Sequence, residues 1–271
     1  MRILMKRIHD RKIPHALLFT GIDGIGRYQA AVRFAMVLNC AEMIRGDSID
    51  QDSLDDKDDA SHFQACETCP SCRKIISQNH PDILHIKPSG SAIKIDQIRS
   101  LRHTLCLKPY EARHRVAILE KAQGMTVPAF NALLKILEEP PERTTMILIA
   151  NKSSDLLPTI ISRCQQIRFA PVADEQISRS LSDRHGINAK RAHIAAAMAG
   201  GSFDVARDLA STKQQRLRDW VLNEMTLLNQ GESTEGKGSI RRTMALAETI
   251  ASNPQTLENV LVVIKSWLRD I

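Results

Sequence analysis

Short apolar runs alternate with segments of helical periodicity through the first 170 residues of the chain. The apolar runs are four to five residues long and read as buried strands, whereas the longer segments repeat their apolar positions every three to four residues. The predicted strands cover residues 16–19, 82–86, 115–119, 146–150 and 166–169, and the predicted helices cover 28–38, 95–105, 127–138 and 156–161. This alternation predicts an α/β domain over 1–170, with a parallel sheet covered by helices on both faces.

The pattern changes at Pro171, after which no strand is predicted. Short helices are expected at 174–185, 189–199 and 202–211, and longer ones at 213–229 and 239–271. We therefore expect a small helical domain over 171–212 and a further helical region over 213–271.

Charge is distributed unevenly along the 271 residues. The formal net charge is +6, but residues 46–60 hold seven aspartates and one lysine and so carry −6, which leaves +12 on the rest. The acidic stretch cannot bury enough apolar surface to fold and is predicted to be a disordered loop. The basic remainder suits DNA phosphates or acidic partners, although a well-solvated surface explains it equally. Aromatic residues make up 4% of the chain, which disfavours a stacking platform for single strands.

Neither a membrane span nor a signal peptide is expected. No stretch approaches the roughly 20 apolar residues that cross a bilayer, and the basic N-terminus lacks an apolar core. These features predict a cytoplasmic protein.

A glycine-rich turn lies between the first predicted strand and helix. Gly21, Gly24 and Gly26 belong to it, and Gly21 and Gly26 have the spacing of the phosphate-binding loop G-x-x-x-x-G-K-[ST]. Arg27 replaces the lysine, and Tyr28 replaces the small hydroxyl residue that ligates magnesium. Three interpretations remain: a loop kept for the fold, weak nucleotide binding, or a working ATP site. The two replacements favour the first.

A second position also departs from nucleotide hydrolases. Glu120 and Lys121 follow the strand at 115–119, where an acidic pair usually binds magnesium and orients water. Lys121 cannot act as a base while protonated, so ATP hydrolysis by this chain is not expected.

Three of the six cysteines form the sequence C-x₂-C-x₂-C. Cys66, Cys69 and Cys72 are spaced so that three thiolates can turn toward one ion, and Cys40 can supply the fourth ligand of a structural zinc. The acidic stretch then separates the first ligand from the second, within an insertion spanning 40–72.

Other assignments of the cysteines stay open. His62 and His80 are rival fourth ligands, and an iron–sulfur cluster or a redox pair could use a similar run. Cys106 and Cys164 are expected to be ordinary buried thiols.

Several segments together resemble the clamp-loader branch of the AAA+ proteins. They are, in order, HALLFTG at 15–21, the cysteine run, NALLKILEEPP at 131–141, LLPTIISRCQQIRF at 156–169 and AMAGGSFDVARDLA at 197–210. A defective phosphate loop combined with a zinc knot is most similar to the delta-prime subunits of bacterial DNA polymerase III. The resemblance covers about residues 13–212 and identifies 171–212 with the helical lid and 213–271 with a partial, incomplete collar, in a truncated or naturally short chain.

The resemblance implies a non-catalytic subunit of a five-membered ring that loads a sliding clamp on primed DNA. Its partners would be gamma/tau-like ATPases and a delta-like wrench. Ser162, Arg163 and Cys164 match the family's Ser-Arg-Cys motif, which implies that Arg163 is an arginine finger facing a neighbour's ATP. Asn151 falls at the sensor-1 position.

The sequence also fits two functions other than a non-catalytic clamp-loader subunit. In one, the chain is itself an active gamma/tau-like ATPase, with Arg27 in place of lysine and Glu120 as the magnesium ligand. In the other, it is a zinc-dependent DNA-binding module outside any ring.

Overall fold

The computed structural model describes residues 13–45 and 65–211. The predicted helices at 213–229 and 239–271, and the acidic stretch 46–60, lie outside the described residues. The chain divides into two compact units, Met1–Ala170 and Pro171–Ile271.

The first unit is built on a five-stranded parallel sheet in the order β2-β3-β4-β1-β5. The strands are β1 Ala16–Thr20, β2 Ile83–Ile86, β3 Arg115–Leu119, β4 Thr144–Ala150 and β5 Gln165–Arg168. This confirms the predicted parallel α/β sheet.

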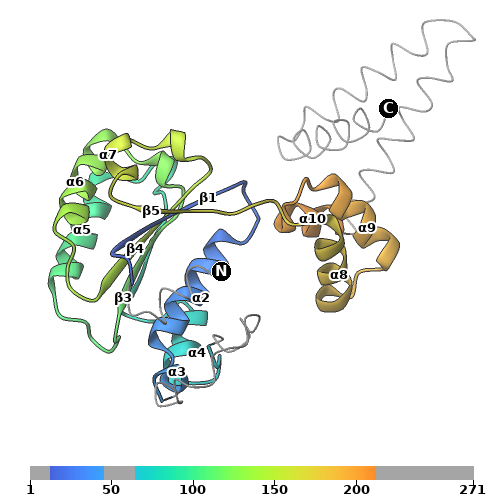
Figure 1. Cartoon of the computed structure of the whole chain (residues 1–271), viewed down its shortest axis with the longest axis horizontal. Helices are drawn as coiled ribbons and strands as arrows, with labels where there is room; N and C mark the ends of the chain where they lie inside the picture. The colour runs from blue at the N-terminus through green and yellow to red at the C-terminus, as the bar shows by residue number, and fades with distance from the viewer. Residues whose placement is uncertain (1–12, 46–64, 212–271) are drawn as a thin grey trace, which may run out of the picture. The chain divides into compact units, whose positions relative to one another are not determined.

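Helices lie on both faces of this sheet (Figure 1). They are α2 Arg27–Asn39 on one face, and α5 Ile95–Cys106, α6 Val127–Glu138 and α7 Pro158–Ile161 on the other. Consecutive strand residues point to opposite faces, so Leu17 and Phe19 pack with α2, whereas Leu18 packs with α5 and α6. The three central strands, β1, β3 and β4, are buried on both sides, which explains why they read as continuous apolar runs. The edge strands β2 and β5 are only partly buried.

The structure also contains short helices that periodicity did not indicate. They are α3 Ala41–Arg45, α4 Pro70–Ile76, and single 3₁₀ turns at Ala122–Gly124 and Ser153–Asp155. Such elements span too few residues to show a helical repeat. The expectation that Cys106 is buried is wrong: Cys106 ends α5 and is exposed, whereas Cys164 is buried as expected.

The second unit contains three short helices in its described part. They are α8 Asp174–His185, α9 Ala189–Met198 and α10 Phe203–Leu209. Ile177, Leu181 and a group of alanines form their common core. The side chains of Asn188 and Ser202 cap the starts of α9 and α10, which supplies acceptors for otherwise unpaired N–H groups.

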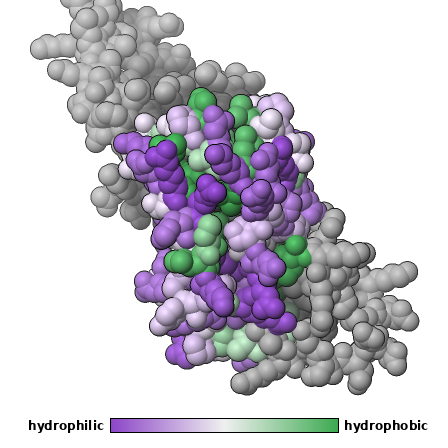
Figure 2. All heavy atoms as spheres, turned by 90° about the vertical axis from the view of Figure 1, so that its left-hand side faces the viewer, coloured by the Kyte–Doolittle hydropathy of each residue, from purple (hydrophilic) through white to green (hydrophobic). Residues whose placement is uncertain are grey.

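The face shown in Figure 2 is mostly hydrophilic, with hydrophobic side chains in small scattered groups. Among the described residues, no helix has the length and apolar character needed to cross a membrane.

Candidate functional site

The glycine loop lies at the carboxyl ends of the central strands. It connects β1 to α2, and the Gly21 N–H donates to the Asn151 carbonyl (3.1 Å), just beyond β4. A side chain at Gly21 would collide with the Phe169 carbonyl, since a Cβ there would lie 2.7 Å from that oxygen. Gly26 precedes α2 with a φ of 87°, a left-handed conformation that suits glycine. Gly21 and Gly26 therefore stand at positions where the loop backbone requires glycine, and Gly24 lies between them.

Arg27 is turned inward and bonded to its own domain. The residue is only 6% exposed. Its guanidinium donates to the Ala150 carbonyl, to the Asp23 carboxylate and to the Asn151 side-chain oxygen, the last at 3.0 Å. The Asn151 amide also donates to Asp23 at 3.2 Å, which closes a ring of contacts between loop and strand end.

This ring bears directly on anion binding. A phosphate-loop lysine acts as a free cation among the phosphates, whereas the Arg27 charge is neutralised by Asp23 within the same loop. A phosphate in the loop would compete with the Asp23 carboxylate for the Arg27 guanidinium.

Tyr28 is also engaged inside the domain. Its ring stacks on His85 with centroids 4.7 Å apart, and its hydroxyl lies 3.5 Å from His85 Nδ1. The other ring nitrogen of His85 bonds to the Glu120 carboxylate. His85 therefore joins Tyr28, which stands where a magnesium-ligating hydroxyl is expected, to Glu120, which stands where a metal-binding carboxylate is expected.

The same contact explains the electrostatics of Glu120. The hydrogen bond with His85 lowers the pKa of Glu120, against the opposing effect of burial, so the carboxylate stays ionised. Burial raises the pKa of Tyr28, and the nearby Glu120 charge adds to that rise. Lys121 follows with a left-handed φ of 50° and supplies no second acid.

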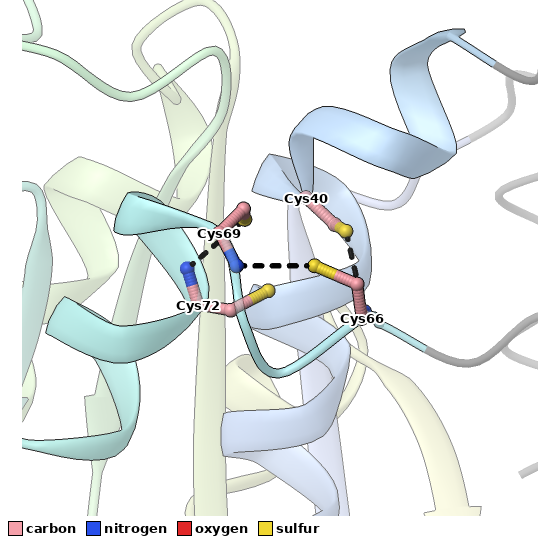
Figure 3. Close-up of side chains that lie close together, drawn as sticks. All are labelled: Cys40, Cys66, Cys69 and Cys72. Atoms are coloured by element: carbon pink, nitrogen blue, oxygen red, sulfur yellow. Dashed lines mark hydrogen bonds between the residues drawn. The ribbon is translucent and has the colours of Figure 1, made fainter.

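The four predicted cysteines form one cluster (Figure 3). Cys40 comes from the end of α2, Cys66 and Cys69 from the segment before α4, and Cys72 from α4 itself. Their sulfur atoms all lie within 4.8 Å of one another. A tetrahedral ion with bonds of about 2.3 Å needs sulfurs about 3.8 Å apart, so the four residues fit one zinc ion.

Backbone N–H groups point at the sulfurs of this cluster. Cys66 N–H donates to Cys40 Sγ at 3.4 Å, Cys69 N–H to Cys66 Sγ at 3.3 Å, and Cys72 N–H to Cys69 Sγ at 3.5 Å. Such bonds favour thiolates. The Thr68 side chain and the Cys69 N–H lower the pKa of Cys66 to about 6, whereas burial raises the pKa of Cys72.

Of the two rival histidines, the structure describes His80, which is not one of the four clustered ligands. His80 is buried and accepts a hydrogen bond from the Asp82 N–H through Nδ1 at 3.2 Å. Its Nε2 lies 3.8 Å from the Glu111 carboxylate. His62 lies outside the described residues.

The Ser-Arg-Cys motif follows α7. Arg163 is partly exposed and makes two contacts within its own unit, donating to the Thr159 carbonyl at 2.9 Å and to the Glu138 carboxylate at 2.8 Å. Ser162 also donates to Thr159. Cys164 is buried, which raises the pKa of its thiol to about 12, so the cysteine is a packing residue.

Sequence reasoning missed three participants: Asp23, His85 and Glu138. His85 lies in an apolar strand and Asp23 in a variable position of the loop, where nothing in the local pattern singles them out. Glu138 belongs to a helix interpreted mainly as packing. A carboxylate four residues before Arg27 was the one available signal, because that spacing favours ion pairs.

Comparison with known proteins places the chain among DNA polymerase III subunits. The family model described as "DNA polymerase III, delta subunit" matches residues 1–173. The DNA polymerase III subunit delta' of Bacillus subtilis is 34% identical over 68% of this chain and 50% of its own length. The subunit tau of the same organism is 31% identical over 65% of this chain and 28% of its own length.

A solved structure supports the fold alone. A mutant of RuvB from Thermotoga maritima is 13% identical and superposes with a TM-score of 0.50, over 91% of this chain and 68% of that one. The chain spans about half or less of the length of the curated relatives named above. With the family model covering the whole of the first unit and the parallel α/β fold in place, the chain belongs to the clamp-loader family of DNA polymerase III subunits.

Proposed function

We propose that this chain is a delta-prime-type subunit of the clamp loader, one that binds no ATP itself and supplies Arg163 to a neighbour's ATP site. The inward bonding of Arg27 carries this proposal. The position that should offer a free cation to phosphate instead holds an internal ion pair with Asp23, and Tyr28 and Glu120 are joined through His85.

The arginine finger follows from position and chemistry. Arg163 stands in the Ser-Arg-Cys motif, is partly exposed and keeps a permanent charge. A guanidinium that enters a neighbouring site stabilises charge on the transferred phosphoryl group. Its neighbour in such an assembly would be a gamma/tau-like ATPase.

The cysteine cluster supports a structural zinc. Four cysteine ligands would leave no open coordination position for a substrate, so zinc would hold the end of α2 to α4. We propose a single zinc ion rather than an iron–sulfur cluster because the four sulfurs lie within 4.8 Å of one another, which suits one ion at the centre of four ligands.

The remaining partners follow from the proposed assembly. We expect a hetero-pentamer with gamma/tau-like and delta-like subunits that loads a sliding clamp on primed DNA in the cytoplasm, with the lid over 171–212 and collar over 213–271 contributing to the ring. The similarity to a tau subunit favours one alternative, an active ATPase, and the site argues against it through Arg27 and Lys121.

The test is the DNA-dependent ATPase of the reconstituted loader. Arg163→Ala should reduce the rate at least about tenfold, because arginine fingers contribute about 10³–10⁵ in related phosphoryl-transfer systems and several sites share the measured turnover. Arg168→Ala is the matched control, since Arg168 is an exposed arginine nearby on β5. Equal rates for both variants and the parent would refute the finger.

A further inference from the structure

The guanidinium of Arg163 is held by two groups of its own chain. Nη2 lies 2.8 Å from the Glu138 carboxylate, and Nη1 lies 2.9 Å from the Thr159 carbonyl. These bonds engage two of the five N–H donors of arginine. Neither contact is buried, because the side chains of Arg163 and Glu138 are 35% and 50% exposed.

Both holding groups sit on anchored backbone. Glu138 is the last residue of α6, which buries Leu133 and Leu137 in the core beneath the sheet. Pro140 follows directly after Glu139 and stops the helix from extending. Thr159 lies in α7, whose Ile160 is fully buried in the same core.

The two hydrogen bonds are strong enough to orient the Arg163 guanidinium and weak enough to let it contact a partner. Loss of an arginine's rotamer freedom is one of the larger side-chain entropy costs of ordering, and two acceptors on anchored backbone offset part of that cost before a partner arrives. An exposed ion pair is weak, so Arg163 can adjust when a phosphate competes for it.

We propose that Glu138 is a positioning residue for Arg163, one that orients the guanidinium toward a neighbouring subunit's nucleotide. This inference rests on the proposed function of Arg163. Glu138 touches no substrate in this role and acts only through the arginine.

The first measurement uses the isolated full-length chain and needs no activity. NMR spectra of the chain with ¹⁵N-labelled arginine report whether an acceptor slows rotation of the Arg163 guanidinium. The Nη signals of Arg163 are identified by their absence in Arg163→Lys. Separate signals are expected in the parent chain and in Glu139→Gln, which removes the same charge one residue away. Averaged signals are expected in Glu138→Ala.

The second measurement is a double-mutant cycle in the reconstituted loader. Glu138→Ala should lower the maximal ATPase rate about two- to fivefold, the range that an exposed ion pair supports, with KM for ATP nearly unchanged. Glu138→Gln, which keeps an acceptor, should recover part of the loss. In the Arg163→Ala background the same change should have no further effect.

The outcomes separate the two claims. Averaged signals in the parent chain, or an equal loss from Glu138→Ala with and without Arg163, would overturn the positioning role while leaving the finger intact. If Arg163→Ala itself leaves the rate unchanged, the proposed function fails, and the positioning role fails with it even where the signals show the pair.

Discussion

Asp23 and Arg27 show how a single side chain can change what a glycine loop with the phosphate-binding backbone is able to bind. The loop keeps its glycines and its place at the end of β1, yet the Arg27 guanidinium bonds to the Asp23 carboxylate and to the end of β4. Arginine can do this because its planar fork bonds several acceptors at once, whereas lysine is a point charge. The identity of the residue was visible in the sequence, but the direction of its side chain was not.

At the same scale, His114 couples stability to pH. Burial lowers its pKa to about 4 from 6.5, and the nearby Arg143 charge contributes. Its Nε2 lies 2.9 Å from the Thr145 hydroxyl, which itself donates to the Pro14 carbonyl. The imidazole is therefore the donor in this contact and is neutral in the folded protein.

We predict that the free energy of unfolding falls as pH drops from about 6.5 toward 4. The folded pKa lies below the unfolded value, so protonation favours the unfolded chain, and the stability present above pH 6.5 is lost through this window at up to about 1.4 kcal/mol per pH unit. Urea unfolding across the window measures it.

His114→Gln keeps a side-chain donor and removes the titrating group. Between pH 6.5 and 4 its free energy of unfolding should therefore fall by roughly 2–3 kcal/mol less than that of the parent chain. The exposed His103 on α5 provides the control: His103→Gln should retain the full dependence. A parent-like dependence in His114→Gln would show that other groups cause it.

Among the elements, α2 and α4 show what sequence patterns capture and what they omit. The C-x₂-C-x₂-C spacing predicted Cys66, Cys69 and Cys72, because ligand spacing within such a run is a local property. Cys40 was preferred over two histidines as the fourth ligand, and the fold brings it beside the other three. Helix α4 was not predicted, since seven residues give no clear period. It begins at Pro70 with Cys69 as its cap, and the Cys69 sulfur accepts from the Cys72 N–H.

We predict one tightly bound zinc per chain, measured by metal analysis of the reduced protein. Cys69→Ser should lower zinc affinity by more than about 100-fold, because even changes beyond the ligands cost about 10–100-fold, and chelation should lower the melting temperature. Cys106→Ser removes an exposed cysteine outside the cluster and should change neither. Stoichiometric iron in place of zinc would contradict the assignment.

Considered as a whole, the first unit was predictable to a large extent because its signals are local or additive. Buried parallel strands read as apolar runs, and their alternation with helices specifies the layer arrangement. The contacts that decide function were not predictable, because Arg27 meets Asn151 and Tyr28 meets His85 across long stretches of sequence. Parallel pairing brings the carboxyl ends of β1, β2, β3 and β4 together, and only the folded sheet shows which side chains meet there.

We propose that an internal ion pair takes the place of nucleotide binding in the glycine loop of this molecule. The most direct test is a titration of the isolated chain with a fluorescent ATP analogue and magnesium, beside the double variant Arg27→Lys/Tyr28→Thr, which restores the phosphate-loop pattern. We predict no binding by the parent chain up to about 1 mM, which means a binding free energy weaker than about −4 kcal/mol, and measurable binding by the double variant. Micromolar binding by the parent chain would contradict it, because nucleotide would then enter the loop despite Asp23 and Arg27.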